Sequence, residues 1–384
     1  MAMSIIYLDN NATTRVHPQV VEAIQPWIYE RFGNPSSSHS LGQQAKEALI
    51  QARAEVAKFL TASPAEIIFT SGATESNHMA IYSALAMYPE RNTIVTSQVE
   101  HPSTLQLLEY LSEQGVNVVY IPVNTKGELD MQALKTAIDA NTALVSLMHA
   151  NNETGVLFPI AEVAALTHRF GALFHTDAAQ TAGKLALNVK ALDCDMLSFS
   201  GHKLHAPKGV GVLFMRKNMT AKPMFYGHQE RKRRGGTENL TGIIGIGVAC
   251  RVAQTQLNEV AHNISALRDR LQAGILKQLP YAKVNGEGHK VPNTTNLSFL
   301  GISGEELLYK LDKVGIIASQ GSACVAGGTD PSHVLLAMGL SRDEALSSVR
   351  FSLSEETTEA EIETAIECIV AVVKEITHSA ALVA

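Results

Sequence analysis

Short apolar runs and longer amphipathic stretches alternate along most of this chain. Strands are predicted at residues 67–70, 93–96, 116–123, 143–148, 172–175, 196–200 and 210–215. Helical spacing of apolar residues separates several of these runs, at 102–113, 131–139 and 160–170. Such alternation predicts a mainly parallel seven-stranded sheet with helices on both faces. The expected fold class is therefore α/β, with a large domain over residues 15–260.

The two ends of the chain show different patterns. Residues 1–16 are polar and predict a loop, and helices are expected next at 16–29 and 45–60. A long helix is predicted at 258–278. Beyond it the expected strands are 296–299, 315–319 and 349–353, with helices at 304–314, 332–338 and 359–376. We interpret residues 1–14 and 261–384 together as a smaller α+β domain.

Composition narrows the class of protein. Of the 384 residues, 46% are hydrophobic and 18% are charged, which is typical of a globular protein of two domains. The net charge of −6 favours neither nucleic acid nor an anionic membrane as a partner. No apolar run is long enough to span a membrane, and the first residues lack the pattern of a signal peptide. We therefore expect a cytoplasmic protein.

The four cysteines are far apart in the sequence. Cys194, Cys250 and Cys368 lie in apolar segments that suggest buried side chains. No CxxC pair occurs, which argues against the common zinc and thioredoxin sites. Cys324 differs because it lies in a stretch of small residues punctuated by glycine, 319–328, which predicts a mobile loop.

The most informative lysine follows the predicted strand 196–200. Lys203 comes after a Ser-Gly break, and this would place it where ligands bind in α/β proteins, beyond the carboxyl end of a strand. An amine in such a crevice can bond covalently to a carbonyl, as it does in enzymes that use pyridoxal 5'-phosphate (PLP). Taken alone, the motif is more simply explained by a surface lysine.

Three other strand ends carry polar residues. Asp177 could keep a pyridine nitrogen protonated or cap a helix, and Gln180 could donate a hydrogen bond to a ring oxygen. His101 could stack on a planar ligand or act as an acid or base, although most single histidines are not catalytic. Asn152 offers an amide donor after strand 143–148. Since four strand ends point polar groups at one region, we predict a single site there.

Three further segments allow two interpretations each. Residues 70–77 predict either a phosphate cradle at a helix start or an ordinary capped helix. The basic run 231–237 suggests a solvated loop, or a phosphate contact through Thr237 across a dimer interface. Arg350 could bind a substrate carboxylate with two hydrogen bonds, or form a salt bridge.

These segments together resemble the NifS/IscS-type cysteine desulfurases, which belong to the class V, fold-type I PLP enzymes. The most specific motifs are Ser200-Gly201-His202-Lys203, Arg234-Gly235-Gly236-Thr237-Glu238-Asn239 and Gly321-Ser322-Ala323-Cys324. The cysteine segment is similar to the first group of the family, and the opening of the chain is closest to NifS-like proteins. The resemblance covers nearly the whole chain.

The resemblance also implies roles for single residues. Lys203 would bind PLP covalently, Asp177 would pair with the pyridine nitrogen, and His101 would stack on the ring. Cys324 would be the nucleophile that accepts sulfur. The other implied cofactor contacts are Ala73, Thr74, Asn152, Gln180, Ser200, His202 and, from the second subunit of a homodimer, Thr237. The implied substrate contacts are Arg350, Asn152 and Asn11, and no metal site is implied.

The implied reaction converts L-cysteine to L-alanine and leaves the sulfur on Cys324 as a persulfide. The expected recipient is an iron-sulfur scaffold protein, with nitrogenase maturation as one destination, or another sulfur acceptor. Two alternatives remain open: a selenocysteine lyase, aminotransferase or other class V PLP enzyme, and an inactive sulfur-relay scaffold. A Cys324→Ser variant that no longer releases sulfur from cysteine would indicate a desulfurase and not another class V PLP enzyme. A purified protein without PLP would support the inactive scaffold.

Overall fold

The computed structural model describes residues 5–321 and 330–383, with side chains as far as residue 378. Its largest element is a seven-stranded sheet in the order β2-β8-β7-β6-β5-β3-β4, which confirms the expected α/β fold. All seven predicted strands are present. Their bounds are β2 Ile67–Thr70, β3 Thr93–Ser97, β4 Asn117–Ile121, β5 Thr142–Met148, β6 Leu173–Asp177, β7 Met196–Ser200 and β8 Gly211–Met215.

The sheet is parallel apart from β8. This strand runs antiparallel to both of its neighbours, β2 and β7, whereas β7, β6, β5, β3 and β4 pair in parallel. The carboxyl ends of the six other strands therefore lie along one edge. Ligands bind at this edge in open α/β sheets.

Helices cover both faces of the sheet because successive side chains of a strand point to opposite sides. On β5, Leu144 packs in one apolar cluster with α4 (Ala73–Met87) and α5 (Pro102–Glu113). Its neighbour Val145 packs in another cluster with α3 (Ser40–Leu60) and α7 (Ile160–His168). The sheet is thus buried on both faces, as its continuous apolar strands require.

The smaller part of the chain contains two short sheets. One has the order β12-β10-β9, and the other pairs β1 with β11. The bounds are β1 Ile6–Tyr7, β9 Ala282–Val284, β10 Thr294–Phe299, β11 Ile316–Ile317 and β12 Ser348–Ser352, with α11 Gly304–Lys313, α12 His333–Ala337, α13 Arg342–Leu346 and α14 Glu359–Val383. Strands β1 and β9 were not predicted, because two or three residues are too few to show a period.

The remaining helices differ from the predictions mainly at their ends. The single helix predicted for 16–29 is wrong: the segment forms α1 (Pro18–Ile24) and α2 (Pro26–Tyr29), which meet at a proline that cannot donate a backbone hydrogen bond. Helix α6 covers Met131–Ala137. The short helices are α8 Val189–Leu192, α9 Gln229–Lys232, and the 3₁₀ turns η1 Pro64–Glu66 and η2 Gly201–Lys203.

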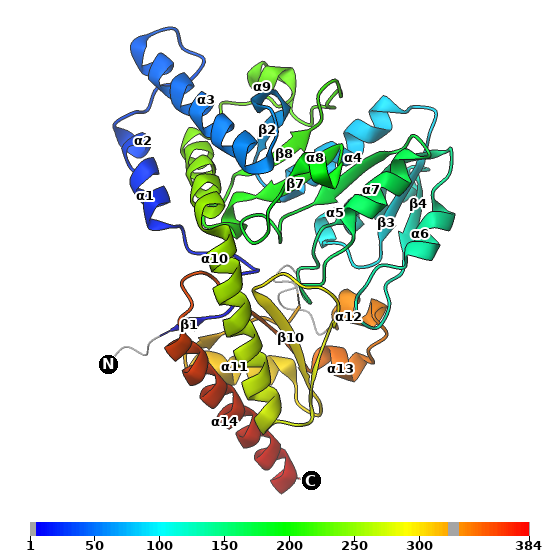
Figure 1. Cartoon of the computed structure of the whole chain (residues 1–384), viewed down its shortest axis with the longest axis vertical. Helices are drawn as coiled ribbons and strands as arrows, with labels where there is room; N and C mark the ends of the chain where they lie inside the picture. Colours follow the sequence, from blue (N-terminus) through cyan, green and yellow to red (C-terminus); the bar gives the residue numbers. More distant parts are fainter. Residues whose placement is uncertain (1–4, 322–329, 384) are drawn as a thin grey trace.

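Helix α10 (Leu240–Gln278) connects the two parts of the molecule and has 39 residues (Figure 1). Its first half contributes residues such as Ile246 to the core of the large sheet. Its second half contributes Leu271 and Ile275 to the core of the smaller part. The helix starts well before the predicted residue 258 and continues through residue 260, where we place the domain boundary. That boundary stays a prediction.

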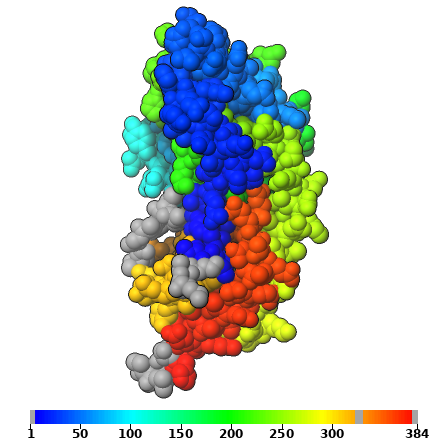
Figure 2. Space-filling model, turned by 90° about the vertical axis from the view of Figure 1, so that its left-hand side faces the viewer, coloured from blue at the N-terminus to red at the C-terminus, as the bar shows by residue number. Residues whose placement is uncertain are grey.

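The N-terminal segment also joins the two parts. Figure 2 shows it in dark blue, running down one face of the molecule from the upper helices to the lower part. The backbone N–H of Asn10 donates to Ser352 O at 3.1 Å, and that of Thr14 donates to His202 O at 3.0 Å. Residues 10–14 thus link β12 to the turn that holds Lys203. Among the described helices, none has an apolar stretch of the length needed to cross a membrane.

Candidate active site

A pocket of about 620 Å³ opens at the carboxyl edge of the large sheet. Its size falls within the usual range for small-molecule sites, roughly 300–1,000 Å³. Eleven of the residues singled out in the sequence line it: Asn11, Ala73, Thr74, His101, Asn152, Asp177, Gln180, Ser200, His202, Lys203 and Arg350. The pocket thus draws on the N-terminal segment, four strand ends and β12.

Two predicted site residues are not part of this pocket. Thr237 is exposed in the loop between α9 and α10 and does not line it. Cys324 lies outside the described residues. The roles that the resemblance implies for all thirteen residues stay predictions.

Lys203 is the last residue of η2, which follows β7 directly. Its Nζ donates to the backbone oxygen of Asn11 and, at 2.8 Å, to that of Ala12. The residue is half-buried and lines the pocket. The carbonyl groups of the N-terminal segment therefore hold the amine at the strand mouth.

Asp177 ends β6 and is buried, with 8% of its surface exposed. One carboxylate oxygen accepts a hydrogen bond from Asn77 Nδ2 at 2.7 Å, and the other accepts one from the backbone N–H of Ala179 at 2.9 Å. These two donors fix the plane of the carboxylate. Asn77 comes from α4, and it was not predicted to have a role of its own beyond its position in the 70–77 motif.

His101 caps α5. Its Nδ1 accepts a hydrogen bond from the backbone N–H of Ser103 at 3.1 Å, so the ring proton lies on Nε2 when the ring is neutral. Burial and the charge of Lys203 lower the pKa of His101, while Asp177 acts in the opposite direction. The lowered pKa favours the neutral imidazole at neutral pH.

The other end of the pocket is built from the start of α4. Gly72 precedes this 15-residue helix, whose first backbone N–H groups have no partners within the helix and attract anions. Ser200 and His202 also line the pocket. Burial and the nearby lysines, Lys203 foremost, lower the pKa of His202 to about 4, so its imidazole is neutral at neutral pH.

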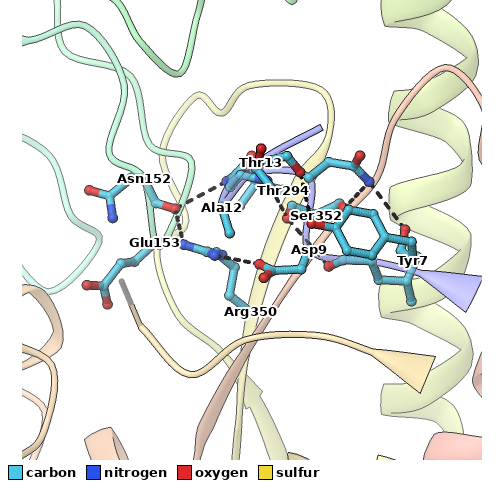
Figure 3. Close-up of polar contacts among 12 residues, drawn as sticks. Tyr7, Asp9, Ala12, Thr13, Asn152, Glu153, Thr294, Arg350 and Ser352 are labelled. Carbon is cyan, nitrogen blue, oxygen red and sulfur yellow. Dashed lines mark hydrogen bonds and ion pairs between the residues drawn. The ribbon is translucent and has the colours of Figure 1, made fainter. Parts of the chain in front are cut away.

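Arg350 on β12 is held from two sides, as Figure 3 shows. Nη2 lies 2.7 Å from Asp9 Oδ1, and Nη1 donates to Asn152 O at 3.0 Å. The side chain is 1% exposed. Its Nε has no hydrogen-bond partner among the described residues. Asp9 was not predicted as a site residue, although it is the only acid in the polar opening that contains Asn11.

Both described ends of the segment that carries Cys324 attach to residues near the pocket. Ser319 and Arg350 exchange backbone hydrogen bonds, at 3.2 and 2.7 Å. Ser332 Oγ donates to Glu153 Oε2 at 2.5 Å, and His333 Nε2 lies 3.0 Å from the backbone oxygen of Glu100, next to His101. The segment therefore starts and ends close to the site.

The residues of the pocket fit PLP. The start of α4 suits a phosphate, the Lys203 amine suits an aldehyde, and the buried Asp177 carboxylate suits a pyridine nitrogen. The three sites belong to one pocket. With PLP bound, Lys203 would carry it, Asp177 and Gln180 would contact its ring, and Ala73, Thr74, Ser200 and His202 would hold its phosphate.

Comparison with known proteins gives consistent results. The model of the aminotransferase class-V family matches residues 6–364. The chain is 50% identical to the cysteine desulfurase NifS of Azotobacter vinelandii over 364 residues, which is 94% of this chain and 90% of that protein. It is 48% identical to a cysteine desulfurase of Nostoc sp. over 367 residues, covering 95% and 92% of the two chains.

Solved structures agree with this result. The structure of a NifS-like protein superimposes with a TM-score of 0.91 at 36% identity and covers 96% of this chain and 99% of its own. Similarity in both sequence and structure thus extends over almost the full length. The chain belongs to the aminotransferase class-V family and, within this family of PLP-dependent enzymes, to the NifS-type cysteine desulfurases.

Proposed function

We propose that this protein is a PLP-dependent cysteine desulfurase that converts L-cysteine to L-alanine and keeps the sulfur on Cys324 as a persulfide. One observation carries the proposal. Lys203, Asp177, His101 and Arg350 line a single pocket, and Ser319, five residues before Cys324 in the sequence, is the backbone partner of Arg350. The described residues that precede Cys324 therefore lie beside the arginine that would bind the substrate carboxylate.

In this proposal, one residue binds the substrate and another transfers a proton. Arg350 would bind the carboxylate of L-cysteine, because a guanidinium matches a carboxylate with two hydrogen bonds. Lys203, once its amine is released, would take the proton from the substrate Cα. Bound PLP supplies an electron sink for the pair that this proton leaves behind.

The sulfur step conserves atoms and electrons. The Cys324 thiolate attacks the sulfur of the substrate, a new S–S bond forms, and the C–S bond breaks with its electron pair staying on the carbon. That carbon then takes up a proton and becomes a methyl group, and Lys203 returns the proton to Cα, which gives L-alanine. The enzyme is left with a persulfide, which passes its outer sulfur to an acceptor.

We propose that the protein that accepts this sulfur takes part in iron-sulfur cluster assembly. Relatives at 48% and 50% identity carry the names cysteine desulfurase and cysteine desulfurase NifS, which supports a role as sulfur donor. We place the protein in the cytoplasm, with a scaffold protein or another thiol acceptor as its partner.

We further propose that the protein acts as a homodimer in which Thr237 contacts the phosphate bound by the second subunit. Thr237 is exposed, and two aromatic side chains near it in sequence are also exposed, Phe225 at 52% and Tyr226 at 77%. Exposed aromatic residues of this kind are enriched at interfaces. Light scattering of the purified protein should give twice the mass of the chain.

The first experiment measures alanine and sulfide formed from L-cysteine by PLP-loaded protein in the presence of dithiothreitol, which releases the persulfide sulfur. We expect equal amounts of both products from the parent and none from Cys324→Ser. The matched control is Cys368→Ser, since Cys368 lies on α14 away from the pocket, and it should keep the parental rate. Full activity of Cys324→Ser would exclude its role as nucleophile.

The alternatives predict other results. Another PLP enzyme of this fold would produce no sulfide from L-cysteine but would transaminate amino acids or release selenide from selenocysteine. An inactive relay scaffold would fail to bind PLP. The presence of Lys203, Asp177, His101 and Arg350 in one pocket favours an active enzyme over this last alternative.

A further inference from the structure

A second lysine lies behind the pocket. Lys184 follows Gln180 by four residues in the turn after β6, and its Nζ donates to both the backbone oxygen and the side-chain Oε1 of Gln180, each at 3.2 Å. Burial lowers the pKa of this amine to about 7, with smaller contributions from the positive charges of Lys203 and Arg350. The desulfurase mechanism above gives this residue no task.

The contacts of Lys184 are not those of an ordinary structural ion pair. Within residues 5–321 and 330–383, its hydrogen bonds go to the two oxygens of Gln180 and to no carboxylate. A buried amine without an acidic partner is costly. A cost of this kind near a functional site suggests that the amine serves the site.

The contact with Lys184 determines how the Gln180 side chain is oriented. A carboxamide can be turned by 180° without a change in shape, which exchanges its donor and acceptor. Lys184 Nζ presents hydrogens, so Oε1 must face it. Nε2 then faces the other way, and it donates to Asn11 O at 3.2 Å. That bond uses one of the two hydrogens on Nε2.

The same network reaches Lys203. The backbone oxygen of Asn11 accepts hydrogen bonds from both Gln180 Nε2 and Lys203 Nζ. The Asn11 side chain is in turn fixed, because its Nδ2 donates to Thr294 Oγ1 at 2.9 Å. Lys184, Gln180, Asn11 and Lys203 therefore form one connected chain, of which Gln180, Asn11 and Lys203 line the pocket.

A small cavity of about 40 Å³ lies beside the two lysines of this chain. Lys184 and Lys203 both line it, together with polar residues that include Asn10 and Asn293. The volume is enough for a water molecule, which needs at least about 10–15 Å³ on this measure. The cavity thus has room for one water molecule beside the Lys184 amine.

We propose that Lys184 is a positioning residue: by holding Oε1 of Gln180, it turns the NH₂ group of that side chain toward the pocket and keeps a hydrogen-bond donor directed at the ring oxygen of PLP. The inference rests on the proposed function, since it needs PLP in this pocket. Without Lys184 the carboxamide is free to turn, and the pocket then presents an acceptor to an oxygen that is itself an acceptor.

The test is a double-mutant cycle on PLP binding, measured by titrating the apoprotein with PLP and following its absorption and the quenching of protein fluorescence. Lys184→Met keeps the length of the side chain but removes its donors, and Lys184→Arg keeps donors. We expect Lys184→Met to raise the dissociation constant of PLP roughly three- to tenfold, the effect of one hydrogen bond, and Lys184→Arg to restore most of the affinity.

The second arm of the cycle uses Gln180→Ala. If Lys184 acts through Gln180, adding Lys184→Met to Gln180→Ala produces no further loss of affinity. The pH at which the absorption band of bound PLP changes should also shift in Lys184→Met and stay at the parental value in Lys184→Arg. Lys190→Met, at an exposed lysine on α8, is the matched control and should leave both readouts unchanged.

Distinct outcomes separate the two proposals. If the parent binds PLP and the losses from Lys184→Met and Gln180→Ala simply add, the positioning role is wrong while the desulfurase stands. If the parent binds no PLP, both fail. Should Lys184→Met not fold, Lys184→Gln takes its place in the cycle, because a glutamine at this position can donate or accept and so does not fix the orientation of Gln180.

Discussion

Asp9 and Arg350 form an ion pair at 2.7 Å, although 341 residues separate them in the sequence. Asp9 lies in the N-terminal segment and Arg350 in β12, and the arginine side chain is almost fully buried. The carboxylate balances the buried guanidinium charge and fixes its plane before a substrate arrives. Loss of one partner of such a pair leaves an uncompensated buried charge.

We therefore expect Asp9→Ala to lower the free energy of unfolding by about 3 kcal/mol and to raise KM for L-cysteine. Urea unfolding and steady-state kinetics measure the two effects. Asp330→Ala is the control, because Asp330 is 81% exposed and lies 3.9 Å from Arg342, the weak geometry of a surface pair. An unchanged KM in Asp9→Ala would show that Arg350 binds the substrate equally well without the Asp9 carboxylate.

A second prediction concerns Asn77 and Asp177. In Asn77→Asp, a second carboxylate would lie where Nδ2 now donates at 2.7 Å, and two carboxylates at this distance do not both stay ionised. The affinity for PLP should fall at least tenfold, as measured by cofactor titration of the apoprotein. The matched control is Asn188→Asp, at the exposed start of α8, where aspartate caps a helix equally well. Parental affinity in Asn77→Asp would mean that Asp177 does not hold the ring nitrogen as an anion.

Because His149 is buried, we expect the free energy of unfolding to fall in acid. Burial lowers its pKa in the folded protein to about 4, whereas the unfolded chain titrates near about 6.5. The folded state therefore binds fewer protons between these values. Stability from this residue is complete above about pH 6.5 and is lost as the pH falls toward 4, by about 1.4 kcal/mol per pH unit.

The difference between the parent and His149→Asn should reveal this effect. Urea unfolding at pH 7.5 and pH 5 measures it, and the variant should lose about 2 kcal/mol less than the parent over that interval. His262→Asn, at an exposed position on α10, should behave like the parent. Equal losses in all three proteins would show that His149 is solvated in the folded state.

Gly211 lets β8 pass close to the start of α4. A Cβ atom at Gly211 would lie 2.5 Å from the Cα of Gly72, whereas a Cβ at Gly72 would meet only Ser200 Oγ, at 3.8 Å. Gly211→Ala should therefore lower the free energy of unfolding by about 1–3 kcal/mol, with a much smaller loss in Gly72→Ala. Thermal unfolding of the two variants compares them directly, and equal shifts would mean that the strand moves away at no cost.

The sequence predicted the large sheet well, because its seven strands are apolar runs of ordinary length. The short strands β1 and β9 were not predicted from the sequence, since their pairing depends on partners far along the chain. Site residues at strand ends, such as Lys203 and Asp177, could be found because parallel strands end at one edge. Asp9, Asn77 and Lys184 could not, because each acts on another side chain, and only the folded geometry reveals such a contact.

The contacts of the N-terminal segment set the moment at which the active site is completed during synthesis. Asn10 and Asn11 bond to Ser352, and Asp9 bonds to Arg350, so this segment, which is synthesised before the large sheet, finds these partners only once β12 has been synthesised. A nascent chain can fold the large sheet earlier, since β2 to β8 end at Met215. The proposed carboxylate site for the substrate, however, is completed only after β12 has emerged, so a chain that ends before β12 should release no sulfur from L-cysteine.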